Sequence, residues 1–195
     1  MKKFTIIILM TIFIVLLSIR GYRLYQDLAN EKSRKEIEEV YAQTVEEINL
    51  IEKQPDTAEK QEIPKSKNGI IGKIEIPKID VSYVILDETT DKNLDISITK
   101  VTGPSINEKG NLVLAGHNMK NDTLFGKLDQ MKRNDSIILY DLAGEAYEFK
   151  VTNTTIVHET DLSALAQDQV DAEYITLITC TSKDDERLIV YGQKI

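Results

Sequence analysis

The sequence predicts an all-β domain over residues 69–195, preceded by a membrane helix and a helical stalk. Three observations lead to this prediction. Short β-branched runs separated by turn clusters fill residues 69–195, a charge-free apolar run opens the chain, and the stretch between them is rich in Glu, Lys and Gln with no Gly or Pro up to Glu52. We therefore expect a membrane anchor at 1–25, a stalk and linker at 26–68, and one folded domain at 69–195.

The membrane anchor is predicted from Phe4–Ile19, sixteen residues without a charge that follow Lys2 and Lys3. Apolar residues as far as Tyr25 extend this run, and Arg20 can reach the interface. A cleaved signal peptide is the alternative, but no small-x-small cleavage site follows the run. We expect an uncleaved single-pass anchor with the rest of the chain outside the membrane.

The stalk is predicted to be a helix from Gln26 to about Glu52 because a narrow apolar stripe recurs there at three- and four-residue spacing. The stripe consists of Ile37, Tyr41, Val45, Ile48 and Ile51. A helix packed on the domain and a solvated spacer explain this pattern equally well. Residues 53–68 contain two prolines and are expected to be a linker, so a fragment starting near Glu62 is expected to fold alone.

Seven runs in the last part of the chain have the composition and length of β-strands. They are Ile70–Ile76, Val81–Leu86, Asn111–Ala115, Ser136–Tyr140, Ala146–Val157, Tyr174–Thr179 and Leu188–Gln193. Helical turns are expected near Thr90–Ile98, Leu124–Met131 and Leu162–Gln167. Short strands with turn clusters between them favour a closed barrel or a sandwich.

The charge distribution excludes nucleic-acid binding. The chain has a formal net charge of −8, and residues 69–195 carry all of it, with 13 Lys and Arg against 21 Asp and Glu. Phosphate contacts need clustered basic side chains, which this acidic domain lacks.

The candidate nucleophile is Cys180, the one cysteine of the chain. If the strands on either side of the six-residue turn pair with each other, Arg187 lies opposite it. A thiol needs a proton partner, and His117 and His158 each follow an apolar strand. A packing cysteine and structural histidines are the alternative, but an unpaired thiol outside the membrane is exposed to oxidation, which favours a functional role.

These residues stand in motifs that resemble those of the sortases, membrane-anchored cysteine transpeptidases of Gram-positive cell surfaces. The similar segments are IEIPKID at 74–80, VTGPSINEKGN at 101–111, LAGHN at 114–118 and TLITC at 176–180, with an arginine shortly after the last. They follow one another in the family's order and cover about Gly69 to Ile195.

The resemblance implies a closed eight-stranded sortase-type β-barrel. It also implies that Cys180 is the nucleophile, that His117 is the general acid and base, and that Arg187 stabilises the substrate or the oxyanion. Ala115 and Thr179 match positions that line the family's substrate groove.

The reaction and its partners are also implied by the resemblance. The family cleaves LPxTG-like C-terminal sorting signals between Thr and Gly and transfers the acyl group to an amine of a cell-wall precursor or a pilin lysine. The enzyme is expected at the cell membrane with its catalytic domain extracellular, and the Glu159–Glu173 loop corresponds to the specificity loop. An extracytoplasmic cysteine hydrolase or protease with the same dyad and a non-enzymatic anchored β-domain stay open as alternatives.

The subclass stays open because the motifs disagree. GHNMKNDTLFGKL resembles the histidine segment of class B, whereas TLITC and the IPKI start resemble classes A or D, and Glu159–Glu173 is too short for the long helix of class B. The acidic loop residues Glu108, Asp161, Asp171 and Glu173 lack the spacing of a calcium loop. We expect a solvated acidic face, no required metal and no cofactor.

Overall fold

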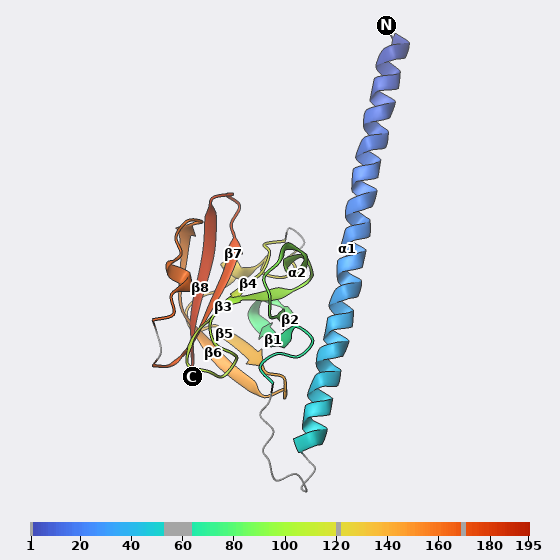
Figure 1. Ribbon diagram of the computed structural model, residues 1–195. Helices are drawn as coiled ribbons and strands as arrows, with labels where there is room; N and C mark the ends of the chain where they lie inside the picture. Colours follow the sequence, from blue (N-terminus) through green and yellow to red (C-terminus); the bar gives the residue numbers. More distant parts are fainter. Residues whose placement is uncertain (1, 53–63, 120–121, 169–170) are drawn as a thin grey trace.

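A closed β-barrel with a long helix beside it forms the molecule (Figure 1). The structure is a computed structural model that describes residues 2–52, 64–119, 122–168 and 171–195. Over these residues eight strands close in the order β1-β2-β3-β4-β7-β8-β6-β5, so the predicted barrel is confirmed. The strands are β1 (Ile70–Ile76), β2 (Val81–Leu86), β3 (Ile98–Thr102), β4 (Gly110–Ala115), β5 (Ser136–Tyr140), β6 (Ala146–His158), β7 (Glu173–Cys180) and β8 (Glu186–Lys194). The helices are α1 (Lys2–Glu52), α2 (Asp91–Ile96) and the short 3₁₀ turns η1 (Pro77–Ile79), η2 (Leu128–Gln130) and η3 (Ser163–Leu165).

Two of the strand pairs in this barrel are parallel, β2 with β3 and β4 with β7. The β4–β7 pair matters for function because parallel neighbours end at the same edge of a sheet. The β7–β8 pair is the predicted antiparallel hairpin. As a result, the carboxyl ends of β4 and β7 and the start of β8 meet at one end of the barrel.

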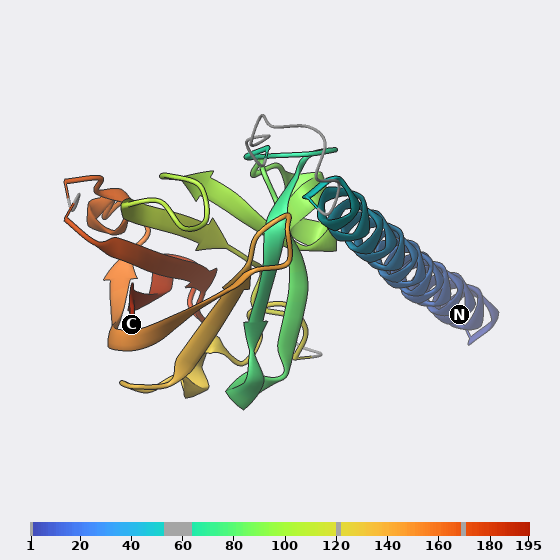
Figure 2. The same cartoon turned by 90° about the horizontal axis from the view of Figure 1, so that it is seen from below.

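Side chains along each strand point alternately into a packed interior and toward an outer face. Ile175 and Leu177 of β7 and Leu188 and Val190 of β8 point into the core and are less than a tenth exposed. The residue that ends β7, Cys180, is exposed. Figure 2 shows the strands curving around this interior.

All seven strands predicted from the pattern are present, and the structure adds β3. The expected helical turn Thr90–Ile98 contains the short helix α2, which is followed by Ser97 and then by Ile98, the first residue of β3. β3 is hard to recognise because it has five residues, pairs with β2 at two positions and has an irregular register with β4. The other two expected turns contain η2 and η3.

The predicted membrane segment and stalk form one unbroken helix, α1. Within the described residues α1 is the one helix long and apolar enough to cross a membrane, and its apolar residues from Phe4 to Leu17 are exposed. This fits a membrane anchor.

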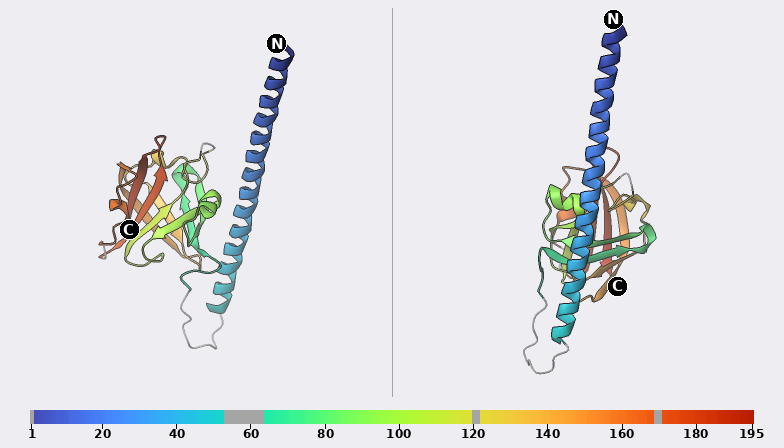
Figure 3. Two further views of the ribbon diagram at one scale, coloured as in Figure 1. Left: turned by 45° about the horizontal axis from the view of Figure 1, so that its top comes forward. Right: turned by 90° about the vertical axis from the view of Figure 1, so that its right-hand side faces the viewer.

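The stalk part of α1 packs on the barrel and is not a solvated spacer (Figure 3). Tyr41 and Ile48 are each 8% exposed, and they share a cluster with Ile70, Val84 and Leu142. The Tyr41 hydroxyl donates to the Asp141 carbonyl over 2.9 Å. Five stripe residues were predicted, and the last of them, Ile51, does not take part because it is 42% exposed.

This packing changes the expectation for a fragment that starts near Glu62. Removal of α1 uncovers the apolar side chains of Ile70, Val84 and Leu142, which are at most 3% exposed in the full chain. An uncovered apolar patch favours association between molecules. The stalk part of α1 therefore covers an apolar patch of the barrel, and the independent folding of the fragment stays a prediction.

Candidate active site

His117 and Cys180 are brought together by the parallel pairing of β4 and β7. The register runs to Ala115 opposite Ile178, and the Gly116 amide continues it by donating to the Ile178 carbonyl over 3.2 Å. Two residues further along each chain stand His117 and Cys180. Because side chains alternate, both lie on the same outer face as Ala115 and Ile178.

Arg187 is placed by the hairpin. Cys180 and Arg187 are direct partners in the β7–β8 register, so the predicted opposition of the two residues is correct. Cys180 is exposed and the Arg187 side chain is 28% exposed. Three adjacent strands thus present an imidazole, a thiol and a guanidinium at one end of the barrel.

The Arg187 guanidinium is held in place by a turn and a loop. Nη1 donates to the carbonyls of Asp184 (2.9 Å) and Glu186 (3.0 Å), and Nη2 donates to Glu159 Oε2 over 2.8 Å. The carboxylate of this ion pair comes from the β6–β7 connection and not from the acidic β7–β8 turn. Three of the five N–H donors are used in these contacts, so up to two others can serve a substrate oxygen.

His117 has an acidic neighbour that the sequence did not indicate. Its Nε2 lies 3.5 Å from Asp95 Oδ1, at the end of α2, and both side chains are partly exposed. Its backbone carbonyl accepts from the Phe125 amide over 3.0 Å. The imidazole is therefore held on a fixed backbone, with one ring nitrogen facing a carboxylate.

The end of β7 is joined to the segment after β4 by two further hydrogen bonds. Asn118 Nδ2 donates to the Cys180 carbonyl over 2.9 Å, and Thr179 Oγ1 donates to the Gly116 carbonyl over 2.7 Å. Thr179 was expected to line the substrate groove, but it is 3% exposed and lies on the face opposite Cys180. Its side chain supports the site from within, whereas Ala115 lies on the outer face.

His158 stands apart from this group. It pairs with Glu186 in the β6–β8 register, and its Nδ1 lies 2.8 Å from Thr160 Oγ1. The next register pair joins Val157 to Arg187, so His158 lies on the opposite face of the sheet from Arg187. Of the two candidate histidines, only His117 follows the strand that pairs with β7, the strand of Cys180.

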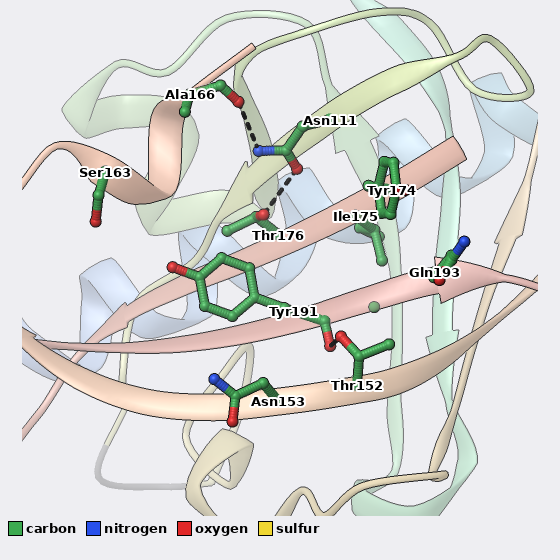
Figure 4. A pocket seen from close by; sticks show the side chains of 11 residues that line it. Asn111, Thr152, Asn153, Ser163, Ala166, Tyr174, Ile175, Thr176, Tyr191 and Gln193 are labelled. Carbon is green, nitrogen blue, oxygen red and sulfur yellow. Dashed lines mark hydrogen bonds between the residues drawn. The ribbon is translucent and has the colours of Figure 1, made fainter. Parts of the chain in front are cut away.

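The β6–β7 connection is fastened to the barrel by Asn111 of β4 (Figure 4). Asn111 is 7% exposed, and its Nδ2 donates to the carbonyls of Ala164 (3.2 Å) and Ala166 (3.1 Å). Its Oδ1 accepts from Thr176 Oγ1 over 2.7 Å, and its backbone carbonyl accepts from Gln167 Nε2 over 2.9 Å. We call this the Asn111 clamp. A pocket of about 370 Å³ lies beside it, lined in part by Tyr174, Tyr191 and Asn153.

The acidic loop residues have partners within the chain. Lys65 and the Ser105 amide hold the pKa of Glu108 below its usual value, and Glu173 lies 2.8 Å from Lys194. The Ser163 amide donates to Asp161, which lowers the pKa of that carboxyl group. In the described ranges no group of three or more His, Cys, Asp or Glu is arranged to hold a metal ion. The absence of a metal requirement stays a prediction.

A strand-end thiol beside a histidine and an arginine defines a thiol acyl-transfer enzyme. The sequence model of the "Sortase domain" matches residues 74–195. The chain belongs to the sortase family of cysteine transpeptidases.

Known relatives agree with this assignment. "Sortase A" of Bacillus anthracis is 38% identical over 73% of this chain and 68% of that protein, and "Sortase A" of Listeria monocytogenes is 34% identical over 65% and 57%. Among solved structures, a Clostridium perfringens "Sortase D5 transpeptidase" is 26% identical with a TM-score of 0.63, covering 80% of this chain and 99% of that one. The structure of "Clostridium perfringens sortase C with the C-terminal cell wall sorting motif" is 29% identical with a TM-score of 0.58, covering 67% and 72%.

Proposed function

We propose that this chain cleaves LPxTG-like sorting signals between Thr and Gly and transfers the acyl group that ends in Thr to an amine. Cys180 is the nucleophile, His117 carries the proton, and Arg187 stabilises the substrate carbonyl. The observation that supports this assignment best is the meeting of these three side chains on adjacent strands, at one end and on one face of the barrel. Ala115, on the same face, is proposed to line the groove.

The first half of the reaction forms a thioester. The Cys180 thiolate adds to the Thr carbonyl carbon, and the negative charge moves to the carbonyl oxygen, where Arg187 donates a hydrogen bond. As the C–N bond breaks, the protonated His117 gives its proton to the departing Gly amine. The products are a thioacyl-enzyme and a free peptide that begins with Gly.

The second half transfers the acyl group. The acceptor amine adds to the thioester carbon while the neutral His117 takes a proton from it. The C–S bond then breaks and Cys180 leaves as a thiolate, which restores the starting state. A cell-wall precursor or a pilin lysine has the required amine.

The orientation at the membrane is also part of the proposal. The exposed apolar part of α1 is long enough to span a bilayer once, and sortases belong to the cell surface. The catalytic domain is then extracellular, and proteins with sorting signals are its partners.

The test is a peptide assay with and without an added amine. We expect an LPxTG peptide to yield ligated product when an amine such as triglycine is present, and a covalent acyl adduct on Cys180 by intact-mass measurement. Cys180→Ala should lose both signals and keep the circular dichroism spectrum. Turnover by that variant contradicts the cysteine mechanism, and hydrolysis without ligation at high amine concentration indicates a hydrolase.

A further inference from the structure

Arg34, in the stalk part of α1, contacts the end of α2. Its Nε donates to the Ile96 carbonyl over 2.7 Å, and its Nη2 donates to the Asp95 carbonyl over 3.0 Å. The last carbonyls of a helix accept no hydrogen bond from within that helix, so they need donors from outside it. A guanidinium, with several donors in one plane, satisfies both carbonyls at once.

The same residue, Asp95, also faces the active site. Its backbone carbonyl is held by Arg34, and its carboxylate lies 3.5 Å from His117 Nε2. One residue therefore joins the stalk helix to the imidazole. The link from α1 to His117 thus passes through a single residue, Asp95.

Helix α2 depends on such outside contacts for its orientation. It has six residues, and helices this short are not stable by themselves. Its start is capped by Thr90, whose hydroxyl accepts from the Asn93 amide over 3.2 Å, and the Ser97 hydroxyl after its end donates to the Val84 carbonyl. Arg34 supplies the contact at the last turn, which is the turn that carries Asp95.

We propose that Arg34 is a positioning residue of the active site, and that it acts through Asp95 on His117. When Asp95 accepts a hydrogen bond from Nε2–H, the other ring nitrogen, Nδ1, is the one left to exchange a proton. The proposal rests on the proposed function for the role of His117 as proton carrier. The stalk is then a support of the catalytic site as well as a tether.

The contact lies a short way along α1 from the expected anchor. Arg34 follows Tyr25, the end of the expected anchor, by nine residues, which is about 14 Å of helix at 1.5 Å per residue. In Figure 1 the β7–β8 turn and α2 lie at the end of the barrel nearest the apolar part of α1. The reactive end of the barrel is thus the end nearest the expected anchor.

The experiment uses the full-length protein in nanodiscs, with Lys32→Ala as the matched control. Lys32→Ala also removes one positive charge from the stalk. The ion pair of Lys32 is with Glu36 on the same helix, and the Lys32 side chain is 79% exposed. We expect Arg34→Ala to lower kcat by about 5- to 20-fold with little change in KM, below the ~10²-fold loss that 1 Å of misplacement can cause. Lys32→Ala should stay within about twofold. Equal behaviour of the two variants overturns the proposal.

A double-mutant cycle separates positioning from general support of the fold. If Arg34 acts through Asp95, the loss caused by Arg34→Ala should largely disappear in an Asp95→Asn background. Arg34→Lys should restore only part of the activity because an ammonium lacks the planar pair of donors. Fully additive losses, or a loss that follows a lowered melting temperature, overturn the proposal.

The alkylation rate of Cys180 by iodoacetamide distinguishes failure of this proposal from failure of the proposed function, because it needs no sorting peptide. His117→Ala should slow alkylation, and Arg34→Ala should slow it less. If His117→Ala has no effect, the proposed dyad is wrong. If His117→Ala slows alkylation but Arg34→Ala matches Lys32→Ala, only the role of Arg34 is wrong.

Discussion

The two histidines of the chain have similar surroundings but different relations to Cys180. Each stands at or just after the end of a barrel strand and is partly exposed, and each has a carboxylate within 4 Å of Nε2: Asp95 at 3.5 Å from His117, and Asp185 at 3.9 Å from His158. They differ in strand position. His117 extends β4, the parallel neighbour of β7, whereas His158 ends β6, which pairs with β8.

In the proposed mechanism, strand register, more than local chemistry, therefore selects the proton partner. The parallel register of β4 and β7 ends at Ala115 and Ile178, and His117 and Cys180 each stand two residues further along. Along β6 the residue that shares a face with Arg187 is Val157, so His158 points the other way. A shift of one residue in the β6–β8 register would reverse that placement.

The largest expected effect separates the two histidines directly. His117→Ala should lower kcat/KM by about 10³-fold or more, because it removes both the acid and the base of the proposed reaction. His158→Ala should stay within about twofold. Both are measured with the same peptide and amine, and the reverse ranking of the two variants would show that the register argument chose the wrong residue.

The next effect tests Arg187, the register partner of Cys180 on β8. Arg187→Ala should lower kcat/KM by about 10²-fold, on the scale of losing an oxyanion donor. Arg187→Lys should also lose much of the activity because the planar fork is lost. The melting temperature should change little, and a lysine variant with near-normal turnover would show that charge alone is enough.

A smaller effect is expected at Asn111, which lies on the same face of β4 as His117 but six residues earlier. Asn111→Ala leaves the Ala164 and Ala166 carbonyls and the Thr176 hydroxyl without their buried partner, at a cost of about 1–3 kcal/mol in the free energy of unfolding. We expect KM for the peptide to rise while alkylation of Cys180 stays near normal. The matched control is Asn153→Ala, from the exposed side of the same pocket.

For Asn111, the decisive measurement combines thermal melting with Michaelis kinetics on both variants. If Asn111→Ala leaves KM and the melting temperature as Asn153→Ala does, then the clamp does not hold the β6–β7 connection in solution.

The smallest effect on activity is expected at the packed stalk, away from either histidine. Tyr41→Phe removes the hydrogen bond to the Asp141 carbonyl but keeps the ring, so the free energy of unfolding should fall by about 1 kcal/mol and kcat/KM should not change. Burial raises the pKa of Tyr41, so this hydroxyl stays a donor well above neutral pH. A large loss of activity in this variant would mean that the whole stalk, and not Arg34 in particular, supports the site.

The sequence by itself determined the local features. The membrane run, the stalk helix, seven of the strands and the opposition of Cys180 to Arg187 follow from hydrophobic periodicity and from a hairpin whose partners are seven residues apart. The motif around His117 favoured that histidine through family resemblance, whereas the residues alone left His158 equally open, and the choice between them stays a prediction.

Only the tertiary structure decided how distant segments meet. The β4–β7 pairing brings His117 to Cys180, and contacts between remote segments join Arg187 to Glu159, Arg34 to α2 and Asn111 to the β6–β7 connection. It also placed Thr179 inside and the stalk on the barrel. The physical reason is that periodicity records which face of a strand or helix is buried, whereas the identity of the neighbour depends on how the closed sheet orders its strands.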